Sequence, residues 1–327
     1  MVWVNFILCI LIILFAGRAV AKYGDIIARK TGFGGLWIGL VLLAIVTSLP
    51  ELFTGISAVT IVKAPDLTIG DLLGANTFNL LNLALLDIAC QQGSLFRMIS
   101  PRLRLIALFS IALVFITGLS IFISSHFSPM GIGWIGLYTP VIIILYLLFA
   151  RVIFRSEQNV SKEAESDYGG MLLKRVYLYF GIAAAFIIGA GIWLALIGNE
   201  IANTYEWASQ SFVGSLFLAF TTSLPEITVS FAAMRLGALD MAAANMIGSN
   251  LFNMTIVSID DLFYLQGPVL AAVSEKHVIT ALVVIGMTGL FILGLKLRPK
   301  KFFRLSWINV TMIALFLVGA CLSFTPA

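Results

Sequence analysis

Apolar runs of twenty or more residues recur from one end of this chain to the other, and each is long enough to cross a bilayer core of about 30 Å. The chain has 327 residues, of which 60% are hydrophobic and 11% are charged, whereas about a quarter of the residues of a soluble domain are charged. We therefore predict an all-α membrane protein in the lipid bilayer, with ten transmembrane helices over residues 2–21, 34–62, 67–91, 103–124, 133–153, 172–197, 210–234, 240–265, 277–296 and 304–325.

The basic residues predict the orientation of these helices. All of the 20 Lys and Arg except Lys63 and Lys276 fall in alternate loops on one side of the predicted bundle. The positive-inside rule makes that side cytoplasmic, so we expect a multi-pass cell-membrane protein with both termini extracellular. Residues 1–21 resemble a signal peptide, but positive charge follows the apolar run instead of preceding it, so we expect the first span there. Topology and lipid headgroups account for the basic clusters, and we expect no nucleic-acid partner.

The two halves of the chain repeat one another. The stretch TSLPE occurs at 47–51 and again at 222–226, and PDLTIGDLLGANTFN at 65–79 matches LDMAAANMIGSNLFN at 239–253. An odd number of spans per repeat makes the second copy enter the membrane from the opposite face, which gives the inverted-topology repeats common in secondary transporters. The predicted organisation is a first repeat over 1–154 with its motif at 36–87, a short cytoplasmic linker over 155–171, and a second repeat over 172–327 with its motif at 211–261.

Each TSLPE motif puts a proline and a glutamate in the middle of a span. Proline has no N–H, so the carbonyls of Val46 and Thr221 lose their helical donors. In hydrocarbon an unpaired carbonyl is costly unless something binds it, and a cation can. The Ser-x-x-Glu spacing also fits a capping box, so an ordinary helix start is the alternative. Because apolar sequence continues on both sides, we expect one broken helix in each repeat.

The two glutamates are the main candidates for binding. An ionised carboxylate in the bilayer core costs several kcal/mol, and neither motif contains a Lys or Arg. Glu51 and Glu226 are therefore expected to share cations or protons. The neighbouring hydroxyl, amide and carbonyl oxygens are hard donors that suit sodium, calcium or magnesium. Calcium takes 6–8 oxygens, and two carboxylates neutralise one divalent ion. The asparagines near residues 76–79 and 250–253 have a second interpretation, as hydrogen bonds between helices.

TSLPE followed by GANTFN, and TSLPE followed by GSNLFN, resemble the alpha-repeats of the calcium/cation antiporter superfamily, and within it prokaryotic-type sodium/calcium exchangers without a large regulatory loop. The resemblance implies that the second, third, seventh and eighth helices surround the site and that the first and sixth slide across them. It implies that Glu51 and Glu226 are the principal calcium ligands. Further sodium or calcium ligands, partly through backbone carbonyls, are implied at Thr47, Ser48, Asn79, Thr222, Ser223 and Ser249, with Val46 and Thr221 as carbonyl donors.

Three positions depart from that family pattern. Ala75 replaces a common serine, so the sodium site on that half is expected to be weak or absent. Asn253 stands where archaeal and potassium-dependent members have Asp, which resembles potassium-independent exchangers; it stays in our predicted ligand set. The family's usual ratio of three sodium ions per calcium ion is therefore not assumed for this chain. Asp71 replaces a usual asparagine and adds a carboxylate near an entrance.

We therefore expect a secondary active antiporter that exchanges calcium for sodium by alternating access. The alternatives are a proton/calcium antiporter, which would use the same two glutamates, and a cation channel, which would not need two broken helices. We expect no enzyme, because neither Gly-x-Ser-x-Gly nor His-Glu-x-x-His occurs, and no cofactor. Cys9, Cys90 and Cys321 have no CxxC spacing, so we expect neither disulfides nor a soft-metal site. The sequence gives no signal of oligomerisation, and a monomer is compatible with it.

The remaining acidic residues receive modest roles. Asp66 and Asp240 begin predicted spans, where an acid near a helix N-terminus is favourable. Asp87, Asp260 and Asp261 lie toward the far ends of their spans. They have two interpretations: a vestibule that attracts cations, or proximity to lipid headgroups.

Overall fold

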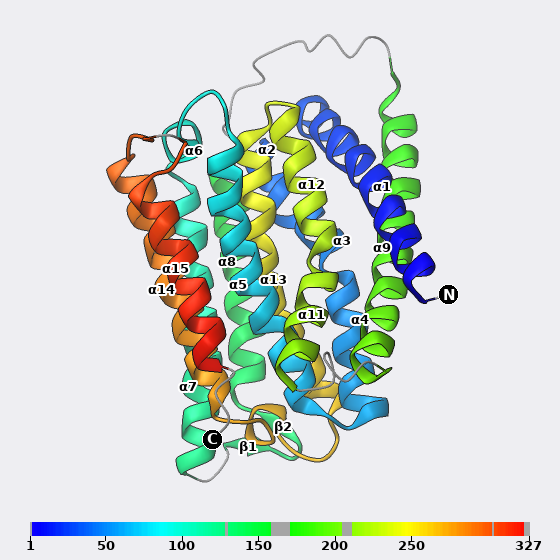
Figure 1. Cartoon of the computed structure of the whole chain (residues 1–327), viewed down its shortest axis with the longest axis vertical. Coiled ribbons are helices and arrows are strands. Elements are labelled where there is room, and N and C mark those ends of the chain that lie inside the picture. The colour runs from blue at the N-terminus through cyan, green and yellow to red at the C-terminus, as the bar shows by residue number, and fades with distance from the viewer. Residues whose placement is uncertain (1, 128–129, 158–170, 205–210, 303, 324–327) are drawn as a thin grey trace.

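The fold is a bundle of long helices (Figure 1). The computed structural model describes residues 2–127, 130–157, 171–204, 211–302 and 304–323. Among these, eight helical segments are long and apolar enough to cross a membrane. They are α1 (Val2–Thr31), the segment Gly35–Val62, α5 (Pro65–Ala89), α7 (Leu103–His126), α8 (Tyr138–Glu157), α9 (Leu173–Thr204), the segment Phe217–Arg235, and α14 (Lys276–Leu297). The prediction of an all-α membrane fold is confirmed.

Two further helices occupy the remaining predicted positions. Helix α13 (Leu239–Phe263) is 25 residues long, carries three aspartates and is largely buried among the other helices. Helix α15 (Trp307–Ser323) has 17 residues and is shorter than a usual span. Helices therefore occur at all ten expected positions, and the crossing of the bilayer by these two stays a prediction.

The second and seventh predicted spans are each interrupted. The second span consists of α2 (Gly35–Trp37), the π-helix η1 (Ile38–Leu43), α3 (Ala44–Thr47), α4 (Leu49–Ser57) and the π-helix η2 (Ala58–Val62). The other consists of α11 (Ser211–Thr222) and α12 (Leu224–Arg235). The breaks fall at Ser48 and Ser223, each two residues before a proline, as expected from the missing proline N–H. Each span is thus two half-helices that meet inside the bundle.

Several ends differ from the predicted spans. Helix α1 continues ten residues past the expected end at 21, to Thr31, because its basic side chains can lie on a helix that projects beyond the lipid. The fifth helix begins at Tyr138 instead of 133, because residues before it form a hairpin of β1 (Gly131–Ile132) and β2 (Ile135–Gly136). Two short helices, α6 (Leu95–Met98) and η3 (Val269–Ala271), lie in loops. Of the predicted linker 155–171, residues 158–170 lie outside the described part of the chain.

Reciprocal contacts relate the two halves by a twofold axis. Asp66, in the first turn of α5, accepts the backbone N–H of Ser274 at 2.6 Å, and Asp240, in the first turn of α13, accepts that of Ser100 at 2.5 Å. Each helix therefore begins beside the loop that follows the other, so α5 and α13 are antiparallel. Contacts that are exchanged in this way are typical of twofold symmetry. These two acids link the halves, in addition to lying at helix N-termini as expected.

Asp87 and Asp261 are fully buried anchors for loops. Asp87 accepts hydrogen bonds from backbone and side chains that follow it, including the Asn309 amide at 2.7 Å. Asp261 accepts the Tyr138 hydroxyl at 2.5 Å and the Val269 N–H at 2.7 Å. Both interpretations left open by the sequence, vestibule and headgroup contact, are replaced for these two residues by a structural one.

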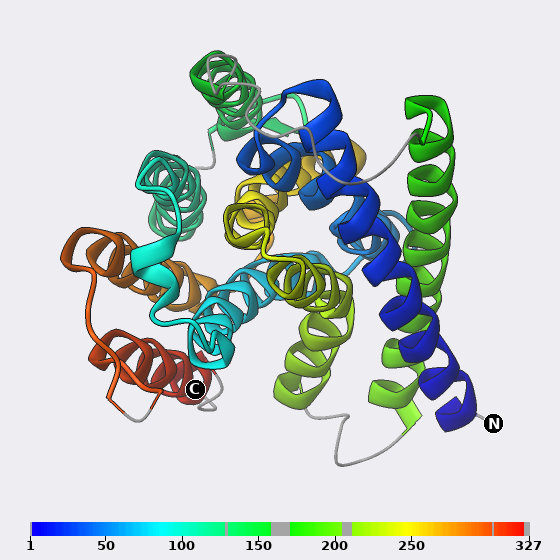
Figure 2. The ribbon, with the colours of Figure 1, turned by 90° about the horizontal axis from the view of Figure 1, so that it is seen from above.

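Helices α1 and α9 pack side by side along one flank of the bundle (Figures 1 and 2). A glycine of each lies against the half-helix of the other repeat. A Cβ on Gly17 would come within 2.5 Å of the Thr228 side chain in α12, and a Cβ on Gly191 within 2.4 Å of the Pro50 ring in α4. The pair therefore covers both broken helices closely.

Close approach also fixes α13 against η1. A Cβ on Gly248 would lie 2.6 Å from the backbone oxygen of Leu40 and 2.9 Å from its Cα. The equivalent Gly74 of α5 lies against Ala219 of α11 in the same way, at 2.9 Å. Both central helices thus depend on glycine where they contact the interrupted spans.

We expect Gly248→Ala to destabilise the protein by about 1–3 kcal/mol, because the new methyl group must push two backbones apart. The measurement is thermal unfolding of the purified protein in detergent. Gly181→Ala in α9 is the matched control, since nothing lies within 4 Å of its Cβ position. Equal stability of the two variants would contradict this account of the packing.

Candidate cation-binding site

The two breaks place Glu51 and Glu226 in the first turns of α4 and α12. Both side chains are 1% exposed. Oε1 of Glu226 accepts the Ser48 hydroxyl of the other repeat at 3.0 Å and the Ser249 hydroxyl at 3.4 Å. Oε2 of Glu226 and both carboxylate oxygens of Glu51 have no hydrogen-bond partner. Three buried carboxylate oxygens are thus left with unused lone pairs.

The capping-box alternative is wrong for this chain. Neither Ser48 nor Ser223 caps its own half-helix with its side chain. The Ser48 hydroxyl is used on Glu226, and the Ser223 hydroxyl is buried without a partner. The serine of each motif therefore offers its oxygen to the centre of the bundle instead of to the helix that follows it.

The threonine hydroxyls lie against carbonyls one helical turn earlier on the same broken spans. Thr47 donates to the carbonyl of Leu43 at 3.0 Å, and its Oγ1 lies 3.4 Å from that of Ser249. Thr222 Oγ1 lies 3.2 Å from the Leu218 carbonyl and 3.1 Å from Oδ1 of Asp71. A hydroxyl that donates its one proton keeps lone pairs for another partner. Each threonine can therefore act as an oxygen ligand while it donates one hydrogen bond.

The carbonyls predicted as ligands belong to buried residues just before the two breaks. Val46 is 9% exposed and Thr221 is fully buried. Each stands four residues before a proline, so the usual helical donor to its carbonyl does not exist. These two oxygens remain proposed ligands.

Four asparagines join α5 to α13 through reciprocal bonds. The amide nitrogen of Asn79 donates to Oδ1 of Asn250, and that of Asn253 donates to Oδ1 of Asn76, both at 3.0 Å. The amides of Asn76 and Asn250 reach each other's backbone carbonyls at 3.5 and 3.2 Å. The expected hydrogen bonding between helices is therefore present. Oδ1 of Asn79 and of Asn253 stays buried and unpartnered, so these two residues can still be ligands.

The two halves of the site are not equivalent. Ser249 bonds to Glu226, but its counterpart Ala75 has no hydroxyl for Glu51. Asp71, expected near an entrance, is 1% exposed, and its Oδ2 has no partner. It lies within electrostatic range of Glu51, as Glu226 does. The side of Glu51 has thus lost a neutral ligand and gained a charge.

Sequence reasoning left Asp260 undecided. The structure buries it fully in the last part of α13, where its Oδ2 accepts the Thr68 hydroxyl at 2.6 Å. The one available signal was that two consecutive aspartates, 260 and 261, end an otherwise apolar helix. That pattern does not say which of the two is satisfied by the fold.

The chemistry of the site is that of hard oxygen donors around uncompensated negative charge. In the described part of the chain, no group of three or more His, Cys, Asp and Glu converges as a metal cluster. None of the described ion pairs involves Glu51, Glu226 or Asp71. Carboxylate, hydroxyl and amide oxygens suit Na⁺ and Ca²⁺ over softer metals. The arrangement therefore offers the oxygen donors that a hard cation needs.

The chain resembles known proteins both in sequence and in fold. The profile of the family described as "Sodium/calcium exchanger protein" matches residues 1–155 and 175–259. Inner membrane protein YrbG of Escherichia coli is 27% identical and is matched over 76% of this chain and 75% of its own length. Sodium/calcium exchanger MaX1 of Methanosarcina acetivorans is 27% identical over 81% of this chain and 84% of its own. A solved structure of the sodium-calcium exchanger NCX_Mj has the same fold, with a TM-score of 0.73 at 23% identity over 97% of this chain and 98% of that one.

We expect calcium to raise the thermal stability of the purified protein, because a bound cation offsets the repulsion among buried carboxylates. At a hundred times the dissociation constant, one bound ion stabilises by about 2.7 kcal/mol. The measurement is the unfolding temperature in detergent with and without CaCl₂. Glu226→Gln should reduce the increase, and Glu275→Gln, a half-exposed acid at the start of α14, should keep it. An equal increase in both variants would contradict the assignment of Glu226.

Proposed function

The chain belongs to the sodium/calcium exchanger family, and on that premise we propose that it exchanges calcium for sodium across the membrane by alternating access. The observation that carries the proposal is the pair of buried glutamates at two helix breaks, with three carboxylate oxygens free. Related proteins named as sodium/calcium exchangers support sodium as the counter-ion. We propose no enzymatic activity and no cofactor.

The proposed ligand set takes oxygens from both repeats. Glu51 and Glu226 supply the charge that one calcium ion needs for neutrality. The set is completed by hydroxyl, amide and carbonyl oxygens of Val46, Thr47, Ser48, Asn79, Thr221, Thr222, Ser223, Ser249 and Asn253. Calcium takes 6–8 oxygens at 2.3–2.6 Å, which this number of donors can provide in alternative subsets.

Obligate exchange follows from the cost of an empty site. Two ionised carboxylates enclosed in a membrane-spanning bundle cost several kcal/mol each. The empty protein therefore meets a high barrier when the site changes sides, whereas calcium or sodium neutralises the charge and removes it. Helices α1 and α9, whose glycines lie against α12 and α4, are the proposed moving pair. Their close contacts with both half-helices at these glycines support this role.

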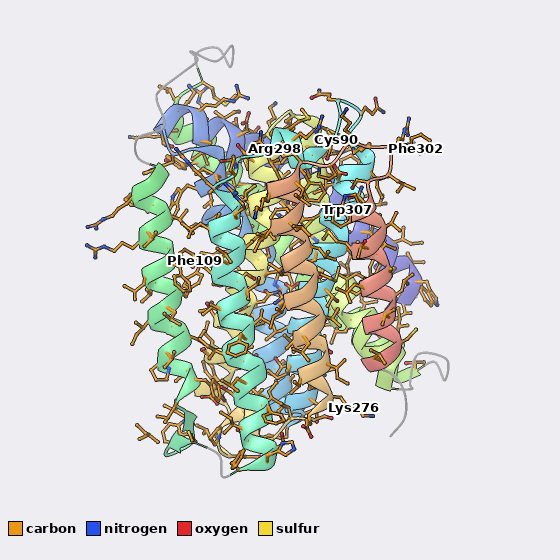
Figure 3. The ribbon with its side chains drawn as sticks, turned by 90° about the vertical axis from the view of Figure 1, so that its left-hand side faces the viewer. Cys90, Phe109, Lys276, Arg298, Phe302 and Trp307 are labelled. Carbon is orange, nitrogen blue, oxygen red and sulfur yellow. The ribbon has the colours of Figure 1, made fainter. Side chains whose placement is uncertain are left out.

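We propose that the ends of α5 and α13 face opposite sides of a cell membrane. Arg298 lies at one end of the bundle and Lys276 at the other (Figure 3). The first of these ends carries most of the Lys and Arg, and the positive-inside rule assigns it to the cytoplasm. Both termini would then be extracellular, and the two repeats, 1–154 and 172–327, would have opposite orientations.

We propose that exchange is independent of potassium. Asn253 gives the central layer an amide where a further carboxylate would add charge, and its amide nitrogen is engaged with Asn76. Ala75 removes one hydroxyl from the side of Glu51. Because these two donors differ from the family pattern, we do not carry over the family's number of sodium ions per calcium ion.

The first test is uptake of radioactive calcium into sodium-loaded vesicles that contain the purified protein. We expect uptake that depends on the sodium gradient and persists without potassium. Glu51→Gln and Glu226→Gln should each reduce uptake to background, because the remaining carboxylate cannot neutralise the ion. Glu275→Gln serves as the control for an acid outside the site.

Three other outcomes are informative. Uptake driven by an imposed pH gradient and not by sodium would identify a proton/calcium antiporter. Steady calcium leak with no counter-cation would identify a channel. Near-normal uptake by both glutamine variants would refute the ligand assignment.

A gain-of-function variant tests the asymmetry of the site. Ala75→Ser should place a hydroxyl beside Glu51 as Ser249 does beside Glu226. One added oxygen contributes about 1 kcal/mol, which lowers the half-saturating sodium concentration about fivefold. The measurement is the sodium dependence of calcium release from vesicles, with Ala84→Ser, a buried site two turns along α5, as the control. An identical sodium dependence of Ala75→Ser and wild type would contradict the proposed sodium ligand.

A further inference from the structure

Two buried aspartates are not among the ligands proposed for the central site. Asp71 of α5 is 1% exposed and Asp260 of α13 is fully buried. Each has one carboxylate oxygen without a hydrogen-bond partner, Oδ2 of Asp71 and Oδ1 of Asp260. The two groups lie within electrostatic range of each other. None of the described ion pairs neutralises them.

Helix geometry places this pair next to the central site. Gly55 is one turn beyond Glu51 on α4, and a Cβ at Gly55 would lie 2.4 Å from Oδ2 of Asp260. Thr68, which donates to Asp260, is one turn before Asp71 on α5. The Asp260 carboxylate is therefore about one helical turn, some 5.4 Å, from the level of Glu51. It lies toward the end of the bundle at which α13 ends.

Hydroxyl oxygens complete the pair. The Thr68 hydroxyl bonds to Oδ2 of Asp260 at 2.6 Å, and the Thr222 hydroxyl lies 3.1 Å from Oδ1 of Asp71. Glycine at 55 leaves the room that Asp260 occupies. Two carboxylates and two hydroxyls with unused lone pairs are the donor types that bind calcium and sodium.

The twofold repeat does not require these acids. The counterpart of Asp71 is Asn245, whose amide donates to the Ser230 hydroxyl at 2.9 Å. The counterpart of Asp260 is Leu86, a buried apolar residue. The other half therefore builds the same helices without the two charges. The two charges are therefore present on one half of the protein only, and the shared fold does not explain them.

A purely structural role fits Asp260 poorly. Its neighbour Asp261 shows what a buried structural acid looks like here, with bonds from Gly136, Tyr138, Thr139 and Val269. Asp260 has one such bond and a free oxygen. A buried carboxylate that is this poorly satisfied needs a cation or a proton.

We propose that Asp71 and Asp260, with the hydroxyls of Thr68 and Thr222, bind a second calcium ion, one helical turn from Glu51 on the less basic side of the protein. The inference deepens the proposed function and rests on it, since it assigns a further site to the same cargo. This site receives calcium from the less basic side before the ion reaches the two glutamates. The equivalent place on the other side has no charge and forms no such site.

The experiment is equilibrium binding of radioactive calcium to the purified full chain in detergent, without sodium. We expect Asp260→Asn to reduce the calcium bound per chain at saturation by about half, because one of two sites is lost. The double variant Glu51→Gln/Glu226→Gln should lose the other half, and adding Asp260→Asn to it should abolish binding. Glu275→Gln should bind as wild type does.

Asp71→Asn provides a second variant that the fold tolerates, since asparagine occupies the equivalent position in the other half. It should also reduce saturation by about half. Unchanged saturation in Asp71→Asn and Asp260→Asn, with binding lost in the double glutamine variant, would overturn this inference and leave the proposed function standing. Binding that survives in the triple variant would overturn it as well. Absence of calcium binding to the wild type would overturn the proposed function itself.

Discussion

The centre of the fold holds two buried carboxylates for which the described part of the chain supplies no ion-pair partner. Glu51 and Glu226 are buried where two helices break, and the described ion pairs leave both of them out. In water two ionised carboxylates carry no desolvation cost, but inside a membrane-spanning bundle each costs several kcal/mol. In the proposed function, a cation completes the structure as well as being the cargo. This gives a physical reason why such a site would change sides only when it is loaded.

Around that charge, several polar groups of one half are satisfied by hydrogen bonds from the other half. The asparagines of α5 and α13 bond to each other reciprocally, and Ser48 of one repeat bonds to Glu226 of the other. First-turn aspartates of both central helices hold the loops of the opposite half. The two repeats are therefore not independent units, since each leaves donors and acceptors that only the other can satisfy.

The two halves differ in the charged and neutral side chains that they place near the glutamates. Ala75 and Asp71 change the side of Glu51, while Ser249 and Asn245 keep the neutral pattern beside Glu226. Gly55 makes room for Asp260, where the other half has Ser230. A symmetric backbone thus carries an asymmetric set of charges. In the proposed exchanger, this asymmetry is where a difference between the two sides of the membrane can arise.

The sequence alone determined the membrane class, the repeat and the positions of the breaks, because hydrophobic length and the missing N–H of proline act locally. It also indicated the glutamates, since their burial follows from the apolar sequence around them. It could not decide between a capping box and a shared serine, nor tell Asp260 from Asp261. Those outcomes depend on which side chains from distant segments meet, as Thr68 meets Asp260 and Tyr138 meets Asp261. Only the tertiary structure brings these partners within hydrogen-bonding distance, and that distance decides which buried acid is fully hydrogen-bonded and which keeps an unpartnered oxygen.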